Sequence, residues 1–203
     1  MISPAAGVMA AFSATTDAGS ADAMEHVAGY TCFNDASVRD WQFHTHQYGM
    51  GRTFRKTGAF GPWLVPAADI PDCRKLVVRG LLNGEQLQEG RLSELAFDIP
   101  HLIAYVSKAL AWNPGDILAT RTPSGIGFKR NPPIFLKPGD VFEVVITEIG
   151  TLSQYSEAIA PFVARYALLT GRWLASTREG RIGLVSREDC VASAVAMKTR
   201  YTT

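Results

Sequence analysis

The sequence predicts an α+β protein that is built mainly of short β-strands. Runs of β-branched and aromatic residues, each of strand length, recur between turn signals throughout residues 23–153. Few segments show the helical period, and they do not alternate regularly with the strands as in a doubly wound parallel sheet. The turn at residues 122–127 lacks both the glycine spacing and the following lysine of a phosphate-binding loop. A nucleotide-dependent enzyme is therefore disfavoured.

The composition fits one globular domain and gives no reason to expect a charged partner. The chain has 203 residues, of which 47% are hydrophobic and 19% charged, so it can bury a sizeable core. A net charge of +1, with no basic cluster among aromatic residues, argues against nucleic acid and acidic membranes as partners. Cys32, Cys73 and Cys190 are odd in number and widely separated, which argues against a disulfide framework and a structural zinc site.

Residues 1–22 are small and weakly patterned, and we expect them to be poorly ordered. The beginning of this segment lacks the basic start of a secretory signal peptide. Its uncharged run is also too short to span a bilayer. A cytoplasmic location is the expectation that results.

A predicted strand and a predicted helix follow this segment. Residues 27–33 form an apolar run of good strand formers, which predicts a strand. Asn34 and Asp35 then provide side chains that commonly start a helix, so we predict a helix over residues 36–48.

Three polar residues would share one face of that helix. Arg39 and Gln42 stand four and seven positions after Asp35, and residues at these spacings lie on the same side of a helix. A carboxylate, a guanidinium and an amide on one face could hold a metal ion and a small carboxylate together. This face is the first candidate functional site.

The middle of the chain contains a turn-rich segment, a hairpin and a second helix. Residues 58–66 are rich in glycine and proline and are predicted as a turn-rich segment. Residues 75–82 and 85–87 are β-prone and flank Asn83-Gly84, the strongest short hairpin signal. Residues 99–111 have a proline in the first turn and apolar residues at helical spacing, which predicts a helix.

The remaining elements are two strands and a tail. Residues 117–119 form a short apolar run, and residues 141–149 are strong β-formers that predict a strand. Residues 154–203 form a divergent tail, in which residues 159–169 have the apolar pattern of an amphipathic helix.

A series of short motifs runs through residues 23–153 and covers about two-thirds of the chain. The motifs are Gly29-Tyr30, Asn34-Asp35, Arg39-Asp40 with Gln42, Gly61-Pro62-Trp63-Leu64-Val65-Pro66, Asn83-Gly84, Gln88-Glu89-Gly90, Phe97-Asp98-Ile99-Pro100, Tyr105-Val106-Ser107, Pro114-Gly115-Asp116-Ile117-Leu118, Thr120-Arg121-Thr122-Pro123, Gly125-Ile126-Gly127, Lys137-Pro138-Gly139-Asp140 and Glu148-Ile149-Gly150-Thr151-Leu152. In their order and spacing they resemble the fumarylacetoacetate hydrolase family, and the branch they are most similar to contains 2-hydroxyhepta-2,4-diene-1,7-dioate isomerases and acylpyruvate hydrolases.

This resemblance implies a mixed β-roll, in most members a homodimer, that binds Mg2+ or Mn2+ through three carboxylates. Members of the family cleave, isomerise, decarboxylate or hydrate small 2-oxo or 2,4-dioxo acids. A hard cation, chelated by the carboxylate and adjacent oxo group of such an acid, polarises the carbonyl and stabilises the enolate that forms as a bond breaks. The implied cofactor is therefore Mg2+ or Mn2+, and the implied partner is a small oxo acid.

Four residues of the chain match site positions of the family. Asp35 matches the third metal carboxylate, and Arg39 matches the residue that pairs with the substrate carboxylate, a role that suits the forked guanidinium. Gln42 would donate an amide hydrogen bond to a substrate oxygen, and Thr122 matches a substrate-binding threonine. A purely structural role is the alternative for three of these residues. Asp35 is a good helix cap, Arg39 is its ordinary i,i+4 partner, and Thr122 is a common residue before proline.

The chain departs from the family pattern at the metal and at the catalytic lysine. The family places a Glu-x-Glu pair about 30 residues before Asp35, and residues 1–24 contain no glutamate, so two of three metal carboxylates are missing. Arg52 takes the position of the catalytic lysine. It keeps the positive charge but cannot transfer a proton, because the pKa of a guanidinium is above about 12.

Two further positions differ from the family. Arg121 stands where the family has a glycine between two threonines, and its side chain could crowd the substrate. His46 falls where some relatives contact the substrate with a tyrosine. His44 and His46 lack the i,i+4 spacing of a paired-histidine metal site, and a surface or interface role is favoured for both.

Two hypotheses about function follow. The first is an enzyme that cleaves a C–C bond in an acylpyruvate-like 2,4-dioxo acid through a metal-stabilised enolate, or that isomerises or decarboxylates a 2-hydroxymuconate-like diacid. The second is a non-catalytic remnant that keeps the fold but lacks the Glu-x-Glu ligands. The number of carboxylates at the metal position distinguishes them, and the sequence supplies only Asp35.

Overall fold

The computed structural model describes residues 1–3, 6–12, 19, 21–54, 57–156, 173–176 and 182–185, and it divides the chain into two compact units. The second unit, residues 157–203, contains an antiparallel pair of strands, β11 (Trp173–Ser176) and β12 (Ile182–Val185). The helix predicted at residues 159–169 lies outside the described residues. No helix among the described residues is long and apolar enough to cross a membrane.

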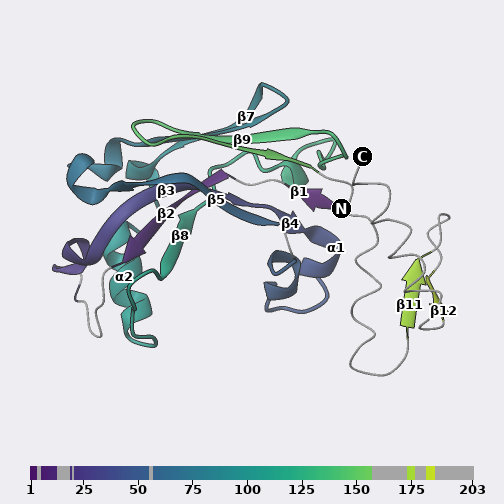
Figure 1. The fold of residues 1–203 in the computed structure, drawn as a ribbon, viewed down its shortest axis with the longest axis horizontal. Helices are drawn as coiled ribbons and strands as arrows, with labels where there is room; N and C mark the ends of the chain where they lie inside the picture. The colour runs from purple at the N-terminus through teal and green to yellow at the C-terminus, as the bar shows by residue number, and fades with distance from the viewer. Residues whose placement is uncertain are drawn as a thin grey trace, which may run out of the picture. The chain divides into compact units, whose positions relative to one another are not determined.

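The first unit, residues 1–156, consists of two four-stranded sheets (Figure 1). One sheet has the order β5-β3-β2-β8 and the other the order β10-β9-β6-β7, with antiparallel neighbours throughout. Their strands are β2 (Ala6–Phe12), β3 (Val27–Asp35), β5 (Gly58–Pro66), β8 (Ile117–Arg121), β6 (Val77–Leu82), β7 (Glu85–Arg91), β9 (Val141–Ile146) and β10 (Gly150–Tyr155). The prediction of a mainly β fold is confirmed.

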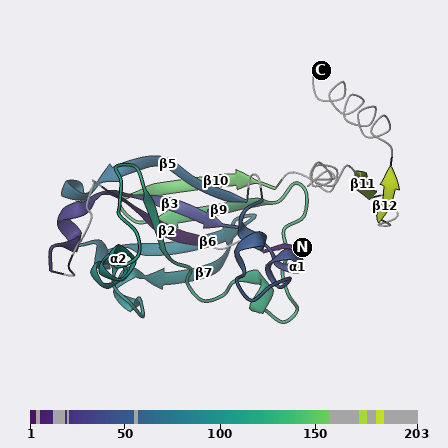
Figure 2. The ribbon, with the colours of Figure 1, turned by 90° about the horizontal axis from the view of Figure 1, so that it is seen from below.

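Short strands and helices complete this unit. Strands β1 (Ile2–Ser3) and β4 (Ser37–Val38) pair with each other, and the two α-helices lie at opposite ends of the unit (Figures 1 and 2). The helices are α1 (Arg39–Gln42) and α2 (Ile99–Ser107), and the 3-10 turns are η1 (Ala23–His26), η2 (Gly49–Arg52), η3 (Ala67–Asp69), η4 (Cys73–Lys75), η5 (Leu92–Glu94) and η6 (Gly127–Lys129).

The core lies between the two sheets. Tyr30 and Cys32 of β3 are buried in one cluster with Phe142, Val144 and Ile146 of β9. Strand β9 alternates buried and less buried residues along its whole length, and β3 does so over its last four residues, so that every second side chain there faces the core. The burial of these side chains stabilises the sandwich and fixes the register of β3, which ends at the candidate site.

Two local predictions are confirmed by the backbone. Asn83 and Gly84 have φ angles of 52° and 84°, the left-handed conformation of a tight hairpin turn between β6 and β7. Helix α2 starts as predicted, because the side chain of Asp98 accepts a hydrogen bond from the backbone N–H of His101. The helix ends at Ser107 instead of residue 111, and the Ser107 hydroxyl donates to the carbonyl of Ile103.

Within residues 1–22, for which the sequence predicts poor order, the structure contains a strand. Strand β2 occupies residues 6–12 and pairs with β3 on one side and β8 on the other. Its backbone hydrogen bonds are therefore satisfied by two neighbours, which its own weakly patterned sequence does not indicate. Likewise, residues 58–66, predicted as turn-rich, form strand β5, which accommodates Pro62 at the edge of its sheet.

The prediction of a helix over residues 36–48 is wrong. Strand β3 continues through Asp35, and β4 follows it directly, so the helix is limited to the four residues of α1. Pairing of Asp35 with Gly58 and of Ser37 with Ser3 provides the backbone hydrogen bonds that a longer helix would have supplied. The strand predicted at residues 141–149 also ends earlier, at Ile146, before a turn into β10.

Candidate functional site

The strand directions bring the predicted site residues to one edge of a sheet. Strands β3 and β8 are both antiparallel to β2, so they end at the same edge, where the antiparallel β5 begins. Asp35 is the last residue of β3, and Thr122 follows the last residue of β8. Arg52 is the last residue of η2, a few positions before β5 begins at Gly58. Segments far apart in the sequence thus form one candidate site.

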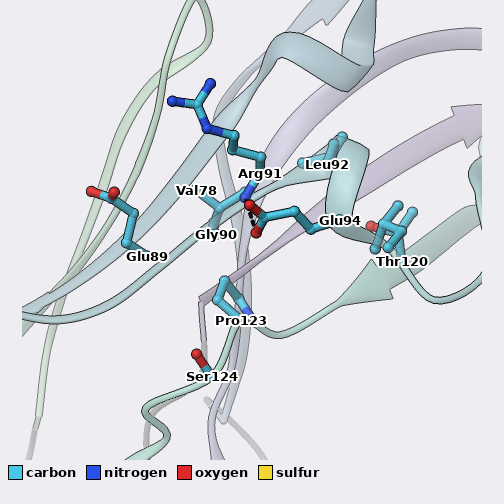
Figure 3. Close-up of a pocket in the computed structure, with 10 residues that line it drawn as sticks. Val78, Glu89, Gly90, Arg91, Leu92, Glu94, Thr120, Pro123 and Ser124 are labelled. Atoms are coloured by element: carbon cyan, nitrogen blue, oxygen red, sulfur yellow. Dashed lines mark hydrogen bonds between the residues drawn. The ribbon is translucent and has the colours of Figure 1, made fainter.

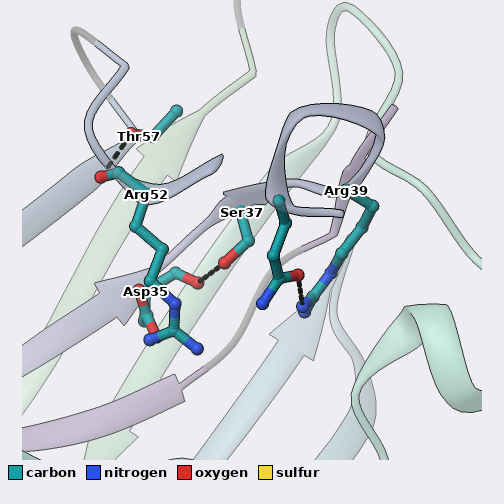
Figure 4. A network of polar contacts seen from close by, with 6 residues as sticks. Asp35, Ser37, Arg39, Arg52 and Thr57 are labelled. Atoms are coloured by element: carbon teal, nitrogen blue, oxygen red, sulfur yellow. Dashed lines mark hydrogen bonds and ion pairs between the residues drawn. The ribbon is translucent and has the colours of Figure 1, made fainter. Parts of the chain in front are cut away.

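Asp35 and Arg52 form an ion pair in this site (Figure 4). The Asp35 side chain is only 15% exposed, whereas that of Arg52 is 50% exposed and reaches over it from the loop. Burial raises the pKa of Asp35, and the nearby charges of Arg52 and Arg39 oppose that rise. The carboxylate of Asp35 therefore depends on guanidinium groups for its compensating charge.

Arg39 is the most buried cation of the site. Arg39 is 7% exposed, and its Nη1 donates a hydrogen bond to Oε1 of Gln42 at 2.6 Å. The ring of Phe128 lies 5.4 Å from its guanidinium carbon. Its Nε is fully buried and has no hydrogen-bond partner among the described residues. Burial lowers the pKa of Arg39. The nearby positive charge of Arg52 lowers this pKa further, and the negative charge of Asp35 raises it.

The three charged groups together favour an anionic ligand. Two guanidinium groups accompany one carboxylate, so Asp35, Arg39 and Arg52 carry a combined charge of +1. Buried guanidinium N–H groups are normally hydrogen-bonded, because leaving one unpaired costs about 1–3 kcal/mol or more. A carboxylate placed against Nε of Arg39 would satisfy both the unpaired donor and the excess charge.

The residues present do not fit Mg2+ or Mn2+. The described residues contain no group of three or more His, Cys, Asp or Glu side chains that could hold a metal ion. The carboxylate of Asp35 is already engaged by Arg52. On β2, Gly7 pairs with Phe33, and cross-strand partners share a face, so Gly7 stands on the face of Asp35 where a second carboxylate would be needed.

Thr122 lies at the same edge of the sheet and is partly buried. The segment after it is held by Gln88, a fully buried residue of β7 that sequence reasoning did not select as a site residue. Gln88 accepts a hydrogen bond from the backbone N–H of Ala6 at 3.1 Å and donates one to the carbonyl of Pro123 at 2.9 Å. Gln88 therefore ties the start of β2 to the turn that contains Thr122.

The two histidines do not join the site. His46 is exposed in the turn after α1, and His44 is exposed with its ring 5.0 Å from that of Trp41. Because α1 ends at Gln42, the helical spacing that related His46 to Gln42 does not apply. A substrate-binding role of His46 stays a prediction without support from this geometry.

Phe128 and Gly51 are further residues that sequence reasoning missed. A Cβ atom added at Gly51 would lie 2.6 Å from Cβ of Gln42 and 2.7 Å from the carbonyl oxygen of Val38, so only glycine fits between η2 and α1. No sequence signal indicated that Phe128, over 80 positions away, would cover Arg39. Gly51 itself, directly before Arg52, was a sequence signal from which close packing at this point could have been inferred.

A small cavity is lined by residues of β6, β7, β8 and the segments that follow β7 and β8, and it does not include Asp35, Arg39, Gln42 or Arg52 (Figure 3). Its volume of about 50 Å³ is well below that of pockets that bind small ligands. Its lining includes Val78, Gly90, Arg91, Glu94, Thr120 and Pro123. The backbone N–H of Arg91 donates a hydrogen bond to the Glu94 carboxylate at this cavity. We therefore assign the candidate site to Asp35, Arg39, Gln42 and Arg52.

Comparison with known proteins gives one family. Residues 8–155 match the family described as fumarylacetoacetate (FAA) hydrolase, C-terminal. The chain is 42% identical over 134 residues to a mitochondrial oxaloacetate tautomerase of Xenopus laevis and 43% identical over 132 residues to the oxaloacetate tautomerase YisK of Bacillus subtilis. Each match covers 65% of this chain but only 42% and 44% of the relative, so the chain spans less than half the length of these proteins.

Solved structures give the same fold. A fumarylacetoacetate hydrolase of Exiguobacterium antarcticum has a TM-score of 0.74 at 30% identity, covering 77% of this chain and 57% of that one. A fumarylpyruvate hydrolase of Pseudomonas aeruginosa, solved in complex with Mn2+ and pyruvate, has a TM-score of 0.69 at 25% identity, covering 77% and 66%. The fold and the sequence match thus agree.

Proposed function

Because the chain belongs to the fumarylacetoacetate hydrolase family, as the match over residues 8–155 shows, we propose that it binds a small 2-oxo acid of the oxaloacetate class. The buried guanidinium of Arg39 carries this proposal. Its Nε has no partner among the described residues, and its Nη1 is already bonded to Gln42. The edge of the guanidinium that contains Nε therefore has an unmet donor, which suits a carboxylate in the forked, bidentate geometry.

The surrounding residues suit an oxo acid better than a plain anion. Gln42 is held by Arg39, which leaves its amide N–H groups to donate to a second ligand oxygen. Arg52 is half exposed and brings a second positive charge to the same place. A 2-oxo acid presents a carboxylate and an adjacent carbonyl oxygen, so it offers acceptors for both groups of donors.

Keto–enol tautomerisation is the reaction that we propose for this site. Guanidinium and amide donors placed at the oxo group would stabilise the negative charge of the enolate, while the proton that leaves C3 goes to solvent water and the oxo oxygen takes a proton from solvent. The tautomerase relatives, at 42% and 43% identity, support it. Cleavage of a 2,4-dioxo acid is the second candidate, supported by the likeness to fumarylpyruvate hydrolase. It is weaker, because cleavage also needs a water molecule activated by a general base, and the guanidinium of Arg52 cannot act as one.

Calorimetry with oxalate tests the proposed binding, because oxalate is a planar, stable mimic of the enolate of a 2-oxo acid. We expect oxalate to bind the native chain and Arg39→Gln to weaken binding at least tenfold. The matched control is Arg74→Gln, which removes an exposed arginine that pairs with Asp72 on the surface. The decay of enol-oxaloacetate absorbance, compared with and without protein, then measures tautomerisation. Equal oxalate affinity in the native chain and Arg39→Gln would reject the assignment of Arg39.

A further inference from the structure

The ion pair between Asp35 and Arg52 places a guanidinium where a cation would meet the one carboxylate of this site. We propose that Arg52 substitutes for a divalent metal ion, so that the site binds its 2-oxo acid through Arg39 and Arg52 without Mg2+ or Mn2+. This inference rests on the proposed function, since it specifies how the same ligand is held. The inference adds to the proposed function the identity of the group that supplies the second positive charge, which is Arg52.

The charges at the site oppose a metal ion. A divalent cation would have to displace Arg52 from Asp35 and would then lie close to two guanidinium groups. Asp35 alone would leave Mg2+ mostly hydrated, because this ion needs several oxygen ligands in octahedral geometry. Like-charge repulsion in a partly buried site adds to that deficit. Arg52 meets the same carboxylate with one charge and with hydrogen bonds.

The adjacent strand supplies no further ligand. The register places Gly7 of β2 opposite Phe33, on the face of the sheet that carries Asp35. A glycine offers no side-chain oxygen, and β2 contains no acidic residue among Ala6–Phe12. The position that would face the metal from this strand therefore cannot hold one.

The loop that carries Arg52 is fixed by contacts of its own. The hydroxyl of Thr57 donates to the carbonyl of Phe54 at 2.6 Å and approaches the carbonyl of Arg52 at 3.4 Å (Figure 4). Gly51 fits tightly against Gln42 of α1. The backbone of Arg52 is thus held next to the helix that carries Arg39, and its half-exposed side chain leaves donors open to a ligand.

Two guanidinium groups match the oxygen pattern of the ligand. The carboxylate of a 2-oxo acid takes the buried Nε edge of Arg39, and its oxo group takes a donor of Arg52. Both interactions are charge-assisted hydrogen bonds, which are stronger than neutral ones and which favour planar acceptors. Binding of one carboxylate also neutralises the excess charge of the site.

The test has two parts, made on separate samples. Oxalate binding is measured by calorimetry in the presence of EDTA, and Mn2+ binding is measured without EDTA from the electron paramagnetic resonance signal of free Mn2+. We expect the native chain to bind oxalate in EDTA, with an affinity that changes less than twofold in Mg2+ buffer, and to leave the Mn2+ signal unchanged. Arg52→Met should weaken oxalate binding at least tenfold. The control Arg79→Met breaks a surface ion pair with Glu89 on the other sheet and should change the affinity less than twofold.

The outcomes separate this inference from the proposed function. Oxalate binding that requires Mg2+ or Mn2+, depletion of the Mn2+ signal by the native chain, or unchanged affinity of Arg52→Met would each overturn the metal-free site and leave oxo-acid binding intact. Absence of oxalate binding under every condition would overturn the proposed function, and this inference with it.

A reverse variant provides a second test. Gly7→Glu and Arg52→Met together add a second carboxylate on the face of Asp35 and remove the competing cation. We expect this variant to deplete the Mn2+ signal and to lose oxalate binding in EDTA. A folded variant that does not bind Mn2+ would contradict the view that Arg52 occupies the place of the cation. The native chain and Arg52→Met decide the matter by themselves if the double variant does not fold.

Discussion

Gly51→Ala is the substitution that most sharply tests how the site is built. Gly51 lies in η2 directly before Arg52 and packs against α1. A methyl group added there would lie 2.6 Å from Cβ of Gln42, 2.7 Å from its Cα and 2.7 Å from the carbonyl oxygen of Val38. These contacts are shorter than van der Waals contacts, and two of the three atoms belong to the backbone. The loop and the helix must therefore move apart.

Gly49, two positions earlier in the same turn, provides the matched control. A methyl group at Gly49 would meet no atom within 4 Å, and neither glycine has a positive φ. Gly49→Ala should therefore stabilise the fold by about 0.4–1 kcal/mol, because alanine reduces the entropy of the unfolded chain. Gly51→Ala gains the same term but loses about 1–3 kcal/mol to overpacking. We expect the difference to lower Tm by several degrees relative to Gly49→Ala.

Urea unfolding of both variants measures this difference in the free energy of unfolding, and oxalate calorimetry measures its effect on the site. We expect Gly51→Ala to weaken oxalate binding at least fivefold, since Gln42 holds Arg39. Gly49→Ala should bind oxalate like the native chain. Equal stability and equal affinity of the two alanine variants would refute the close packing of η2 on α1.

Three other predictions concern groups outside the charged cluster. Gln88→Leu leaves the backbone groups of Ala6 and Pro123 unpaired, so we expect it to lower the free energy of unfolding in urea by about 2–4 kcal/mol. Burial raises the pKa of the Cys32 thiol to about 11 from its ordinary 9.0, so its stabilising contribution is complete below pH 9 and is lost as pH rises toward 11. The native chain should therefore lose stability over this range, and Cys32→Ala should lose less. Asp98→Ala removes the cap of α2 and should cost about 1 kcal/mol by thermal unfolding.

Features set by neighbouring residues could be predicted from the sequence. The Asn83-Gly84 turn requires two left-handed residues, and these two residue types adopt that conformation readily. The start of α2 depends on a cap and a proline within four residues. The family motifs were enough to predict the fold and to select Asp35 and Arg39, because their spacing survives in this chain.

Features that depend on distant pairing could not be predicted. The signals after residue 33 suited a helix start, but pairing of Asp35 with Gly58 extends the strand and moves the helix start to Arg39. Strand β2 has no local pattern and exists because β3 and β8 flank it. The ion pair of Asp35 with Arg52 depends on a loop whose position is set by η2. The sequence therefore indicated that an arginine replaces the family lysine, but it did not indicate that this arginine pairs with Asp35.

A crystal structure of the native chain with oxalate, grown with Mn2+ present, tests the central claim most directly. The account predicts one oxalate carboxylate within hydrogen-bond distance of Nε of Arg39, a second oxygen near Arg52, and Arg52 still paired with Asp35. A Mn2+ ion bound to Asp35, identified by its anomalous signal, with Arg52 turned away would contradict it.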